Sequence, residues 1–115
     1  MRVHLSETSS TNDDVKARLG RQGLDWVVVT ADRQTGGRGQ YARQWVSDIG
    51  GLYFSMGFPF RSCGFQLSPH LTFSLAQCVQ RSIFSLTGSE SRIEWPNDLI
   101  VNYKKMAGFL VERVV

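Results

Sequence analysis

The sequence predicts an α+β domain built on a mixed β-sheet, with helices packed on one face of that sheet. Two observations support this class. Short runs of β-branched and aromatic residues recur along the chain, and two segments with helix start and stop signals fall between groups of these runs. Closely spaced turn residues in the last third predict hairpin connections between strands. The expected order of elements is therefore β-α-β-loop-β-α-β-β-β, within a single domain of 115 residues.

The elements of the first half follow from local signals. Residues 2–5 (RVHL) predict a short edge strand. The hydroxyl and amide side chains of residues 9–12 (SSTN) are typical helix caps, and residues 13–23 open with two acids and end on a glycine, as helices often do. The β-branched run at residues 25–31 (DWVVVTA) predicts a buried strand. A glycine-rich loop follows this strand.

The second half predicts one long helix between strands. Residues 52–60 (LYFSMGFPF) predict a strand that a proline stops. A helix is expected over residues 67–88, with Ser68 as its N-cap, Pro69 in the first helical position and Gly88 at its end. The remaining expected strands are residues 91–95, 99–102 and 105–115, the last of them long.

Composition excludes several classes of protein. No apolar run approaches the roughly 20 residues that a membrane helix needs, and the N-terminus lacks the apolar stretch of a signal peptide. A cytoplasmic protein without a membrane segment is therefore expected. The net charge of +3 is too modest to indicate a nucleic-acid binder. Cys63 and Cys78 lie among apolar residues without metal-ligand spacing, so buried free thiols are expected rather than a zinc site or a disulfide.

The loop from Gln34 to Trp45 (QTGGRGQYARQW) combines three features of an anion-binding site. Glycines let backbone N–H groups converge on an anion, arginines form bidentate charged hydrogen bonds, and an aromatic ring can stack on a base. The alternative is a solvated connector in which the glycines ease a turn. The spacing matches neither a P-loop nor G-x-G-x-x-G, because the last glycine of the second pattern is Ala42 here.

Three shorter segments carry weaker signals. In EWPNDL, Asn97 and Asp98 stand at a rigid corner where they could bind a ribose, a metal or an amine, or merely close an Asx-type turn. In KKMAGFLVE, a lysine that opens a buried strand with a glycine three residues later could bring charge and backbone to a ligand, or form a solvated hairpin. The SSTN segment could direct hydroxyls at a polar head group, or act only as caps.

Taken in order, these four segments resemble the catalytic domain of the biotin protein ligases over nearly the whole chain. The family pattern reads S-T-N, then Q-x-x-G-R-G-R-x-G-R-x-W, then W-P-N-D, then K-[LIVM]-A-G-[IV]-L-x-E. The matching residues are Ser10, Thr11 and Asn12; Gln34, Gly37, Arg38, Gly39, Arg43 and Trp45; Trp95, Pro96, Asn97 and Asp98; and Lys105 to Glu112. Four ordered motifs at family-like spacing are a far stronger signal than any one of them.

The resemblance implies a class II synthetase-like biotin/lipoate ligase fold and a two-step reaction. Biotin and ATP would condense to biotinyl-5′-AMP and pyrophosphate, with Mg²⁺ that arrives with ATP. A lysine of the biotin carboxyl carrier domain of acetyl-CoA carboxylase would then take the biotin as an amide. The resemblance implies no nucleic-acid or membrane partner, and it leaves a homodimer open.

The resemblance also implies roles for individual residues, each by its position in the motifs. Lys105 and Arg38 would be the catalytic cations. Biotin would be bound by Ser10, Thr11, Gln34, Gly37, Arg38, Gly39, Lys105 and Gly108. ATP and the adenylate would be bound by Arg38, Gln40, Arg43, Trp45, Asn97, Asp98 and Lys105, with no metal ligand from the protein.

Three loop residues depart from the family pattern. Gln40 replaces the arginine that follows G-R-G, Tyr41 replaces a residue that is usually basic, and Ala42 replaces a glycine. An amide can hydrogen-bond a phosphate but brings no charge, and alanine has a narrower range of backbone angles than glycine. We therefore expect the adenylate to be held less tightly here than is usual in the family.

Length is a further departure. The family's catalytic domain continues beyond the last motif, and many members add a C-terminal barrel or, in repressor types, an N-terminal DNA-binding domain. Residues 1–115 are therefore expected to be the N-terminal portion of the catalytic domain, without either added domain. Three alternatives stay open: an impaired or non-catalytic remnant that binds biotin or adenylate, a relative of the lipoate ligases, and an interaction module with incidental motifs.

Overall fold

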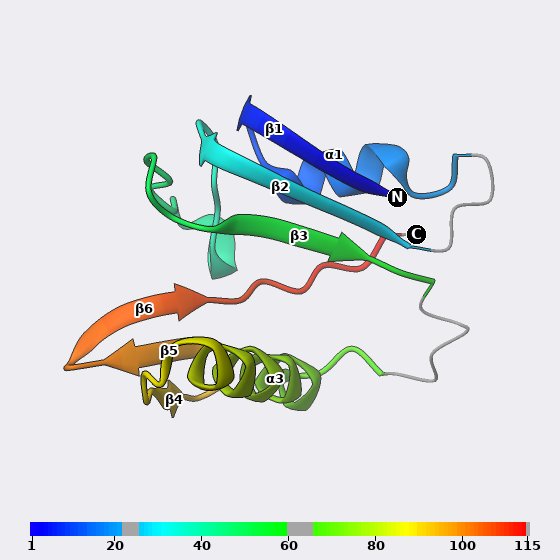
Figure 1. Cartoon of the computed structure of the whole chain (residues 1–115). Helices are drawn as coiled ribbons and strands as arrows, with labels where there is room; N and C mark the ends of the chain where they lie inside the picture. Colours follow the sequence, from blue (N-terminus) through cyan, green and yellow to red (C-terminus); the bar gives the residue numbers. More distant parts are fainter. Residues whose placement is uncertain (22–25, 60–65, 115) are drawn as a thin grey trace. The chain divides into compact units, whose positions relative to one another are not determined.

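The computed structural model describes residues 1–21, 26–59 and 66–114 of the chain, which divides into two compact units, Met1–Gly64 and Phe65–Val115 (Figure 1). The α+β class is confirmed. Within the described residues, however, the strands form two sheets of three strands each, one mixed and one antiparallel, rather than a single mixed sheet. The last three strands are joined by short turns, so they pair with one another.

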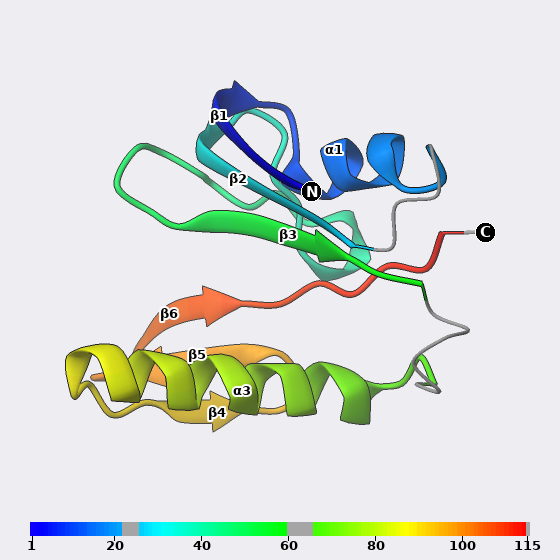
Figure 2. The same ribbon diagram turned by 45° about the vertical axis from the view of Figure 1, so that its right-hand side comes forward.

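In the first unit, β1 (Arg2–Thr8) and β2 (Val27–Gln34) are parallel, and β3 (Tyr53–Gly57) pairs antiparallel with β2. The helix α1 (Thr11–Arg18) forms the crossover between β1 and β2 and lies over one face of this sheet (Figure 2). Because β1 and β2 are parallel, both strands end at the same edge of the sheet. The SSTN segment and the glycine-rich loop, which follow these two ends, therefore start side by side.

The core of the first unit is small and aliphatic. Val27 and Val29 of β2 are fully buried, and Val15 of α1 is 5% exposed. Successive side chains of a strand point to opposite faces, so the two valines share the face that α1 covers. Burying each such side chain stabilises the fold by about 1.5–3 kcal/mol. Partly buried residues that pack against this core are Val3, Leu5 and Leu19.

The start of α1 differs in its chemistry from the prediction. Ser10 occupies the N-cap position, but its side chain makes no capping hydrogen bond. The first helical N–H, that of Thr11, donates instead to Oε1 of Gln34 at 2.8 Å. The acceptor that this helix end needs is therefore supplied from the end of β2, and a local reading of SSTN could not have found it.

In the second unit, the helix α3 (Pro69–Thr87) precedes β4 (Arg92–Glu94), β5 (Asp98–Val101) and β6 (Lys104–Gly108). These strands form the antiparallel sheet in that order, and α3 lies against β4 and β5 (Figure 1). Leu99 of β5 is fully buried, which makes it a centre of this unit's core.

Both predicted ends of α3 are confirmed. Ser68 is the N-cap, its Oγ accepts a hydrogen bond of 3.3 Å from the Leu71 N–H, and Pro69 takes the first helical position. Gly88 follows the last turn with a φ of 74°, and its N–H donates to the Phe84 carbonyl at 2.8 Å. Neighbouring residues alone specify these ends, which is why the sequence predicts them.

The prediction of a long final strand over residues 105–115 is wrong. The β5–β6 ladder ends with Asp98 opposite Gly108, and residues 109–114 belong to no strand. The reason is the partner, because β5 has only four residues and cannot pair with eleven. The apolar pattern of this segment is that of a strand, but a strand requires a ladder.

The expectation of buried thiols is wrong for Cys78, which is free and exposed on α3. The buried residues of that helix are Thr72 and Ala76, and a residue two positions beyond Ala76 points to the opposite side of a helix. Cys63 lies outside the described residues. No helix in the described part of the chain is long and apolar enough to cross a membrane.

The turn between β5 and β6 supports a first prediction. Asn102 and Tyr103 have φ of 50° and 63°, the signs that a two-residue type I′ turn requires, and Tyr103 is 99% exposed. Tyr103→Gly is therefore expected to raise the free energy of unfolding by about 0.5–1 kcal/mol, since glycine removes the left-handed strain without losing packing. Urea unfolding measures the change. Tyr103→Ala retains a Cβ and should give no gain; an equal gain from both variants would contradict the explanation.

Candidate functional site

The glycine-rich loop of the first unit is an irregular hairpin, not a loose connector. Its two sides pair at Gln34 with Ser47 and at Arg38 with Gln44. Three backbone hydrogen bonds cross it: the Gln34 N–H to the Ser47 carbonyl (3.0 Å), the Trp45 N–H to the Gly37 carbonyl (2.8 Å) and the Gly39 N–H to the Arg43 carbonyl (2.7 Å). The loop is also tied to the SSTN segment, because the Gly36 N–H donates to the Ser9 carbonyl at 2.8 Å.

The tip of this hairpin is the short 3₁₀ turn η1 (Gln40–Ala42), where the sequence departs from the family pattern. Tyr41 and Ala42 have φ of 59° and 58°, in the left-handed region that favours glycine. Ala42 therefore adopts a glycine-like backbone at the position where the pattern has glycine. The guanidinium of Arg43 lies over the Tyr41 ring at 5.9 Å, so Arg43 is turned toward the exposed tip.

Beneath the loop, buried polar side chains form a network centred on Gln34. Its Oε1 accepts hydrogen bonds from the Thr11 N–H (2.8 Å) and the Thr11 hydroxyl (3.1 Å), and its Nε2 donates to Ser47 Oγ at 3.0 Å. The Thr11 hydroxyl also lies 2.7 Å from Ser55 Oγ, and Ser55 in turn donates to Asn12 Oδ1. Thr11, Ser47 and Ser55 are each less than 9% exposed. Hydroxyls and amides buried this way are preorganised to meet a polar ligand.

The cation of this network is Arg38. Its two terminal nitrogens donate to the two oxygens of Asp13, Nη2 to Oδ1 at 2.8 Å and Nη1 to Oδ2 at 3.1 Å. Nη1 also donates to Oγ of Ser10 at 3.2 Å, and Ser10 is only 3% exposed. The guanidinium is thus held against the first turn of α1, by Asp13 and by Ser10, the residue that precedes Thr11 of the network.

Gly37 is the tightest point of the loop. It is buried, and a Cβ built on it would lie 2.6 Å from Ser47 Oγ, 2.7 Å from the Trp45 carbonyl oxygen and 2.9 Å from Gln34 Nε2. Contacts this short with a carbon are repulsive, so the position admits only glycine without a rearrangement. The backbone of the loop can approach Gln34 only because this side chain is absent.

In the second unit, the W-P-N-D corner and the K-M-A-G segment lie on paired strands. Nζ of Lys105 is 3.0 Å from Oδ1 of Asp98, whose side chain is 20% exposed. Gly108 stands directly opposite Asp98 in the β5–β6 ladder. The carboxylate, the ammonium and the open backbone of the glycine therefore share one end of this sheet.

A β-bulge in β6 determines the direction of the Lys105 side chain. Lys105 opposes Ile100 and Ala107 opposes Leu99, so Met106 is an extra residue without a partner in the ladder. Opposed residues of antiparallel strands share a face of the sheet. Without the extra residue, Lys105 would turn to the opposite face, away from the carboxylate that it contacts.

Asn97 joins this corner to the segment that follows β6. Its Nδ2 donates to the Phe109 carbonyl at 3.2 Å, and its own carbonyl accepts from the Phe109 N–H at 3.0 Å. Trp95 is 53% exposed and its ring contacts those of His70 and Phe73, with centroids 5.3 Å and 5.1 Å away. The corner is thus held on both sides by contacts that reach across the second unit.

The structure brings most of the predicted site residues together within their own unit. The first unit gathers Ser10, Thr11, Gln34, Gly37 and Arg38, and the second gathers Asn97, Asp98, Lys105 and Gly108. Less central are Gly39, Gln40, Arg43 and Trp45, which lie along the hairpin itself. Three further residues of the site, Asp13, Ser47 and Ser55, were not predicted from the sequence. Of these, only Ser55 had a signal, because it is a polar residue at an inward position of a strand.

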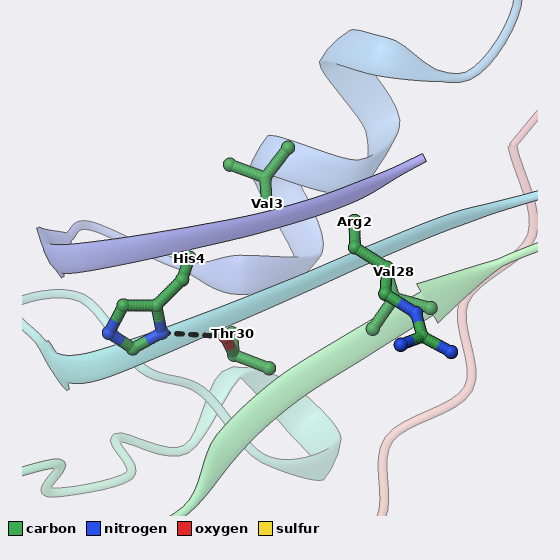
Figure 3. Close-up of a pocket in the computed structure, with 5 residues that line it drawn as sticks. All are labelled: Arg2, Val3, His4, Val28 and Thr30. Carbon is green, nitrogen blue, oxygen red and sulfur yellow. Dashed lines mark hydrogen bonds between the residues drawn. The ribbon is translucent and has the colours of Figure 1, made fainter.

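Among the described residues, no group of three or more His, Cys, Asp or Glu side chains could hold a metal ion. A hollow of about 310 Å³ lies on the first sheet, where His4 Nδ1 and Thr30 Oγ1 are hydrogen-bonded at 2.7 Å (Figure 3). Its lining is Arg2, Val3, His4, Val28 and Thr30, and none of these is a predicted site residue.

Known proteins match the chain over nearly its whole length. The model of the biotin/lipoate A/B protein ligase family matches residues 6–115. The bifunctional ligase/repressor BirA of Bacillus spizizenii is 34% identical over 111 residues, which are 96% of this chain and 34% of that protein. The biotin–[acetyl-CoA-carboxylase] ligase of Mycobacterium tuberculosis is 31% identical over 113 residues, 94% of this chain and 42% of that protein. The chain therefore spans well under half the length of these curated relatives.

Solved structures match as well. The biotin protein ligase of Leishmania major in complex with biotinyl-5-AMP has a TM-score of 0.89 at 28% identity, covering 98% of this chain and 52% of that one. The biotin protein ligase of Aquifex aeolicus in complex with biotin and ATP has a TM-score of 0.82 at 33% identity, covering 97% of this chain and 46% of that one. The fold implied by the four motifs is thereby confirmed.

Proposed function

The chain belongs to the biotin/lipoate A/B protein ligase family, and from this premise we propose that it carries part of the catalytic domain of a biotin protein ligase. Such an enzyme condenses biotin with ATP to biotinyl-5′-AMP, releasing pyrophosphate, and then transfers the biotin to a lysine of a biotin carboxyl carrier protein, releasing AMP. The observation that carries the proposal is the buried polar network centred on Gln34, beneath the glycine-rich loop that contains Arg38.

The network suits the head group of biotin. The ureido ring has both N–H donors and a carbonyl acceptor, so a site for it needs both kinds of partner. Ser10, Thr11 and Gln34 provide hydroxyls and an amide that are already buried or half-buried and hydrogen-bonded. A site assembled in advance loses little conformational entropy when the ligand binds. Because their hydroxyls and amide match the donors and acceptor of the ureido ring, we assign these three residues to biotin rather than to the nucleotide.

The loop suits the phosphate. Formation of the adenylate requires a carboxylate to attack the α-phosphate of a polyanion, and cations must offset the repulsion. Arg38 brings a guanidinium fork, which matches phosphate oxygens in pairs, and Gly37 and Gly39 let the loop backbone come close. In the second unit Lys105 supplies a compact ammonium, the second catalytic cation of the proposal.

The remaining residues are assigned to the nucleotide. Trp45 would stack on the adenine ring, and the further adenylate contacts would come from Gln40, Arg43, Asn97 and Asp98, with Gly108 beside biotin. Mg²⁺ bound to ATP would lower the charge on its phosphates, and in the proposal the ion arrives with ATP. Biotin is favoured over lipoate by the G-R-G loop, by W-P-N-D and by relatives whose names specify biotin.

The proposal is tested by exchange of labelled pyrophosphate into ATP. A biotin protein ligase should catalyse this exchange only when biotin is present, because the first step is reversible. A binding remnant would be stabilised against thermal unfolding by biotin or biotinyl-5′-AMP but would show no exchange. Exchange that is independent of biotin, or that depends on lipoate, would contradict the proposed substrate, and the absence of both exchange and binding would contradict the function altogether.

The tip of the loop provides a second prediction. Gln40→Arg is expected to slow dissociation of biotinyl-5′-AMP by about five- to tenfold, because a charged hydrogen bond to phosphate replaces a neutral one. Fluorescence or filter-binding decay after dilution measures the rate. Ile49→Arg adds the same charge outside the hairpin, at a position of the same unit that is 78% exposed, and should leave the rate unchanged. An unaltered rate in Gln40→Arg would show that the weaker charge of this loop is irrelevant to adenylate retention.

A further inference from the structure

We propose that Asp13 is a positioning residue that occupies the guanidinium fork of Arg38 while the site is empty, and that the phosphate of the ligand must displace it. The inference rests on the proposed function, which supplies the phosphate. Asp13 lies outside the four motifs, and none of the roles assigned above to biotin or nucleotide binding includes it. Asp13 would therefore set how tightly a phosphate-bearing ligand binds without touching that ligand.

The contact has the geometry with which arginine recognises phosphate. Nη2 and Nη1 of Arg38 donate in parallel to the two oxygens of Asp13, at 2.8 Å and 3.1 Å. This fork-to-fork arrangement presents one edge of the guanidinium to two oxygens. A phosphate that binds through that same edge needs the same N–H groups, so the two anions compete for them.

The exposure of the two side chains makes it feasible for a phosphate to replace Asp13 on Arg38. The side chain of Asp13 is 53% exposed and that of Arg38 is 27% exposed. An ion pair at this level of exposure is weak, because water and salt screen it. Asp13 can therefore rotate into solvent when a phosphate binds the same two N–H groups of Arg38. Meanwhile the hydrogen bond of 3.2 Å to Ser10 keeps Nη1 of Arg38 near the buried network.

The competing explanation is that Asp13 only stabilises the helix, as an acid in the first turn does. The neighbouring Asp14 is the control for this explanation. Asp13 and Asp14 both lie in the first turn of α1, where any acid favours the helix dipole. Asp14, however, pairs with Arg18 at 3.1 Å and accepts a hydrogen bond from Thr8. The two positions thus share charge and helix location but differ in their contact with Arg38.

The test is calorimetric titration of the intact chain with a non-hydrolysable analogue of biotinyl-5′-AMP that keeps the phosphate charge. Asp13→Asn should bind this analogue about two- to fivefold more tightly than wild type, the range expected from losing an exposed competing pair. It should bind uncharged biotin amide as wild type does. Asp14→Asn should change neither affinity, and Asp13→Glu, which keeps the charge, should stay near wild type.

Each other outcome is decisive. If wild type binds the analogue and Asp13→Asn binds it equally or more weakly, the inference is overturned while the proposed function stands. An equal gain in Asp14→Asn, or a gain that persists when Arg38 is replaced by alanine, would attribute the effect to general charge and overturn it too. If neither wild type nor variant binds the analogue, both the inference and the function fail. Asp13→Gln serves as a second uncharged variant, and loss of folding in both would show a purely structural residue.

Discussion

The Lys105→Ala variant is expected to lose biotin-dependent exchange of pyrophosphate into ATP, with a rate at least about a hundredfold below wild type. Nζ of Lys105 lies 3.0 Å from Oδ1 of Asp98, which places the ammonium beside this carboxylate. In the proposed reaction this charge offsets the repulsion between the biotin carboxylate and the α-phosphate. A methyl group supplies no such charge, and the effect should therefore appear in kcat as well as in the affinity for ATP.

The neighbouring lysine is the matched control for this experiment. Lys104 opposes Val101 and Lys105 opposes Ile100, so the two side chains start from adjacent positions of one short strand. Adjacent residues of a strand point to opposite faces, and Lys104→Ala should keep the exchange rate within about twofold of wild type. Equal losses in the two variants would assign the effect to net charge or to the hairpin. A Lys105→Ala enzyme with more than a tenth of the wild-type rate would contradict the catalytic role.

The features predicted most accurately from the sequence are those that depend on neighbouring residues. The helix α3 begins and ends as expected because Ser68, Pro69 and Gly88 act within one turn of the positions that they determine. The strand order and the α+β class follow for a similar reason, since runs of apolar residues and turn signals are local. The fold class was within reach of the sequence because most of its determinants are short-range.

Several features that the sequence does not predict depend on long-range pairing. The length of β6 depends on β5, its partner, and not on the apolar residues that continue to the end of the described chain. The start of α1 is capped by Gln34, which is 23 positions away from Thr11. The bulge at Met106, which turns Lys105 toward Asp98, is visible only in the register of the ladder. None of these features has a signature in the residues next to it.

The residues of the candidate site show the same difference between local and long-range features. Order and spacing of the motifs pointed to Gln34, Arg38 and Lys105, because those residues stand in recognisable patterns. Asp13 and Ser47 belong to no motif and enter the site through side-chain contacts alone, with Arg38 and with Gln34. Residues of this kind support the ones that contact a ligand, and single-sequence patterns do not identify them.

The structure also gives Gly37 a role that its place in a glycine-rich loop does not reveal. Gly37→Ala is expected to lower the melting temperature by about 5–10 °C and to weaken biotin binding at least about tenfold, because overpacking costs about 1–3 kcal/mol in a closed site. The new methyl would lie 2.6 Å from Ser47 Oγ, 2.7 Å from the Trp45 carbonyl and 2.9 Å from Gln34 Nε2. Moving Gln34 would also remove the acceptor of the first N–H of α1.

Gly39→Ala separates this steric effect from a general loss of loop flexibility. A Cβ at Gly39 would meet only the Arg43 carbonyl, at 3.9 Å, and the backbone there has an ordinary φ of −106°. The melting temperature of Gly39→Ala should therefore stay within about 2 °C of wild type, although Gly39 lies only two residues from Gly37 in the same loop. Differential scanning calorimetry and titration with biotin measure both variants. If the two alanines destabilised the chain equally, flexibility rather than packing would explain the glycines, and if Gly37→Ala bound biotin normally, the network around Gln34 would not be the biotin site.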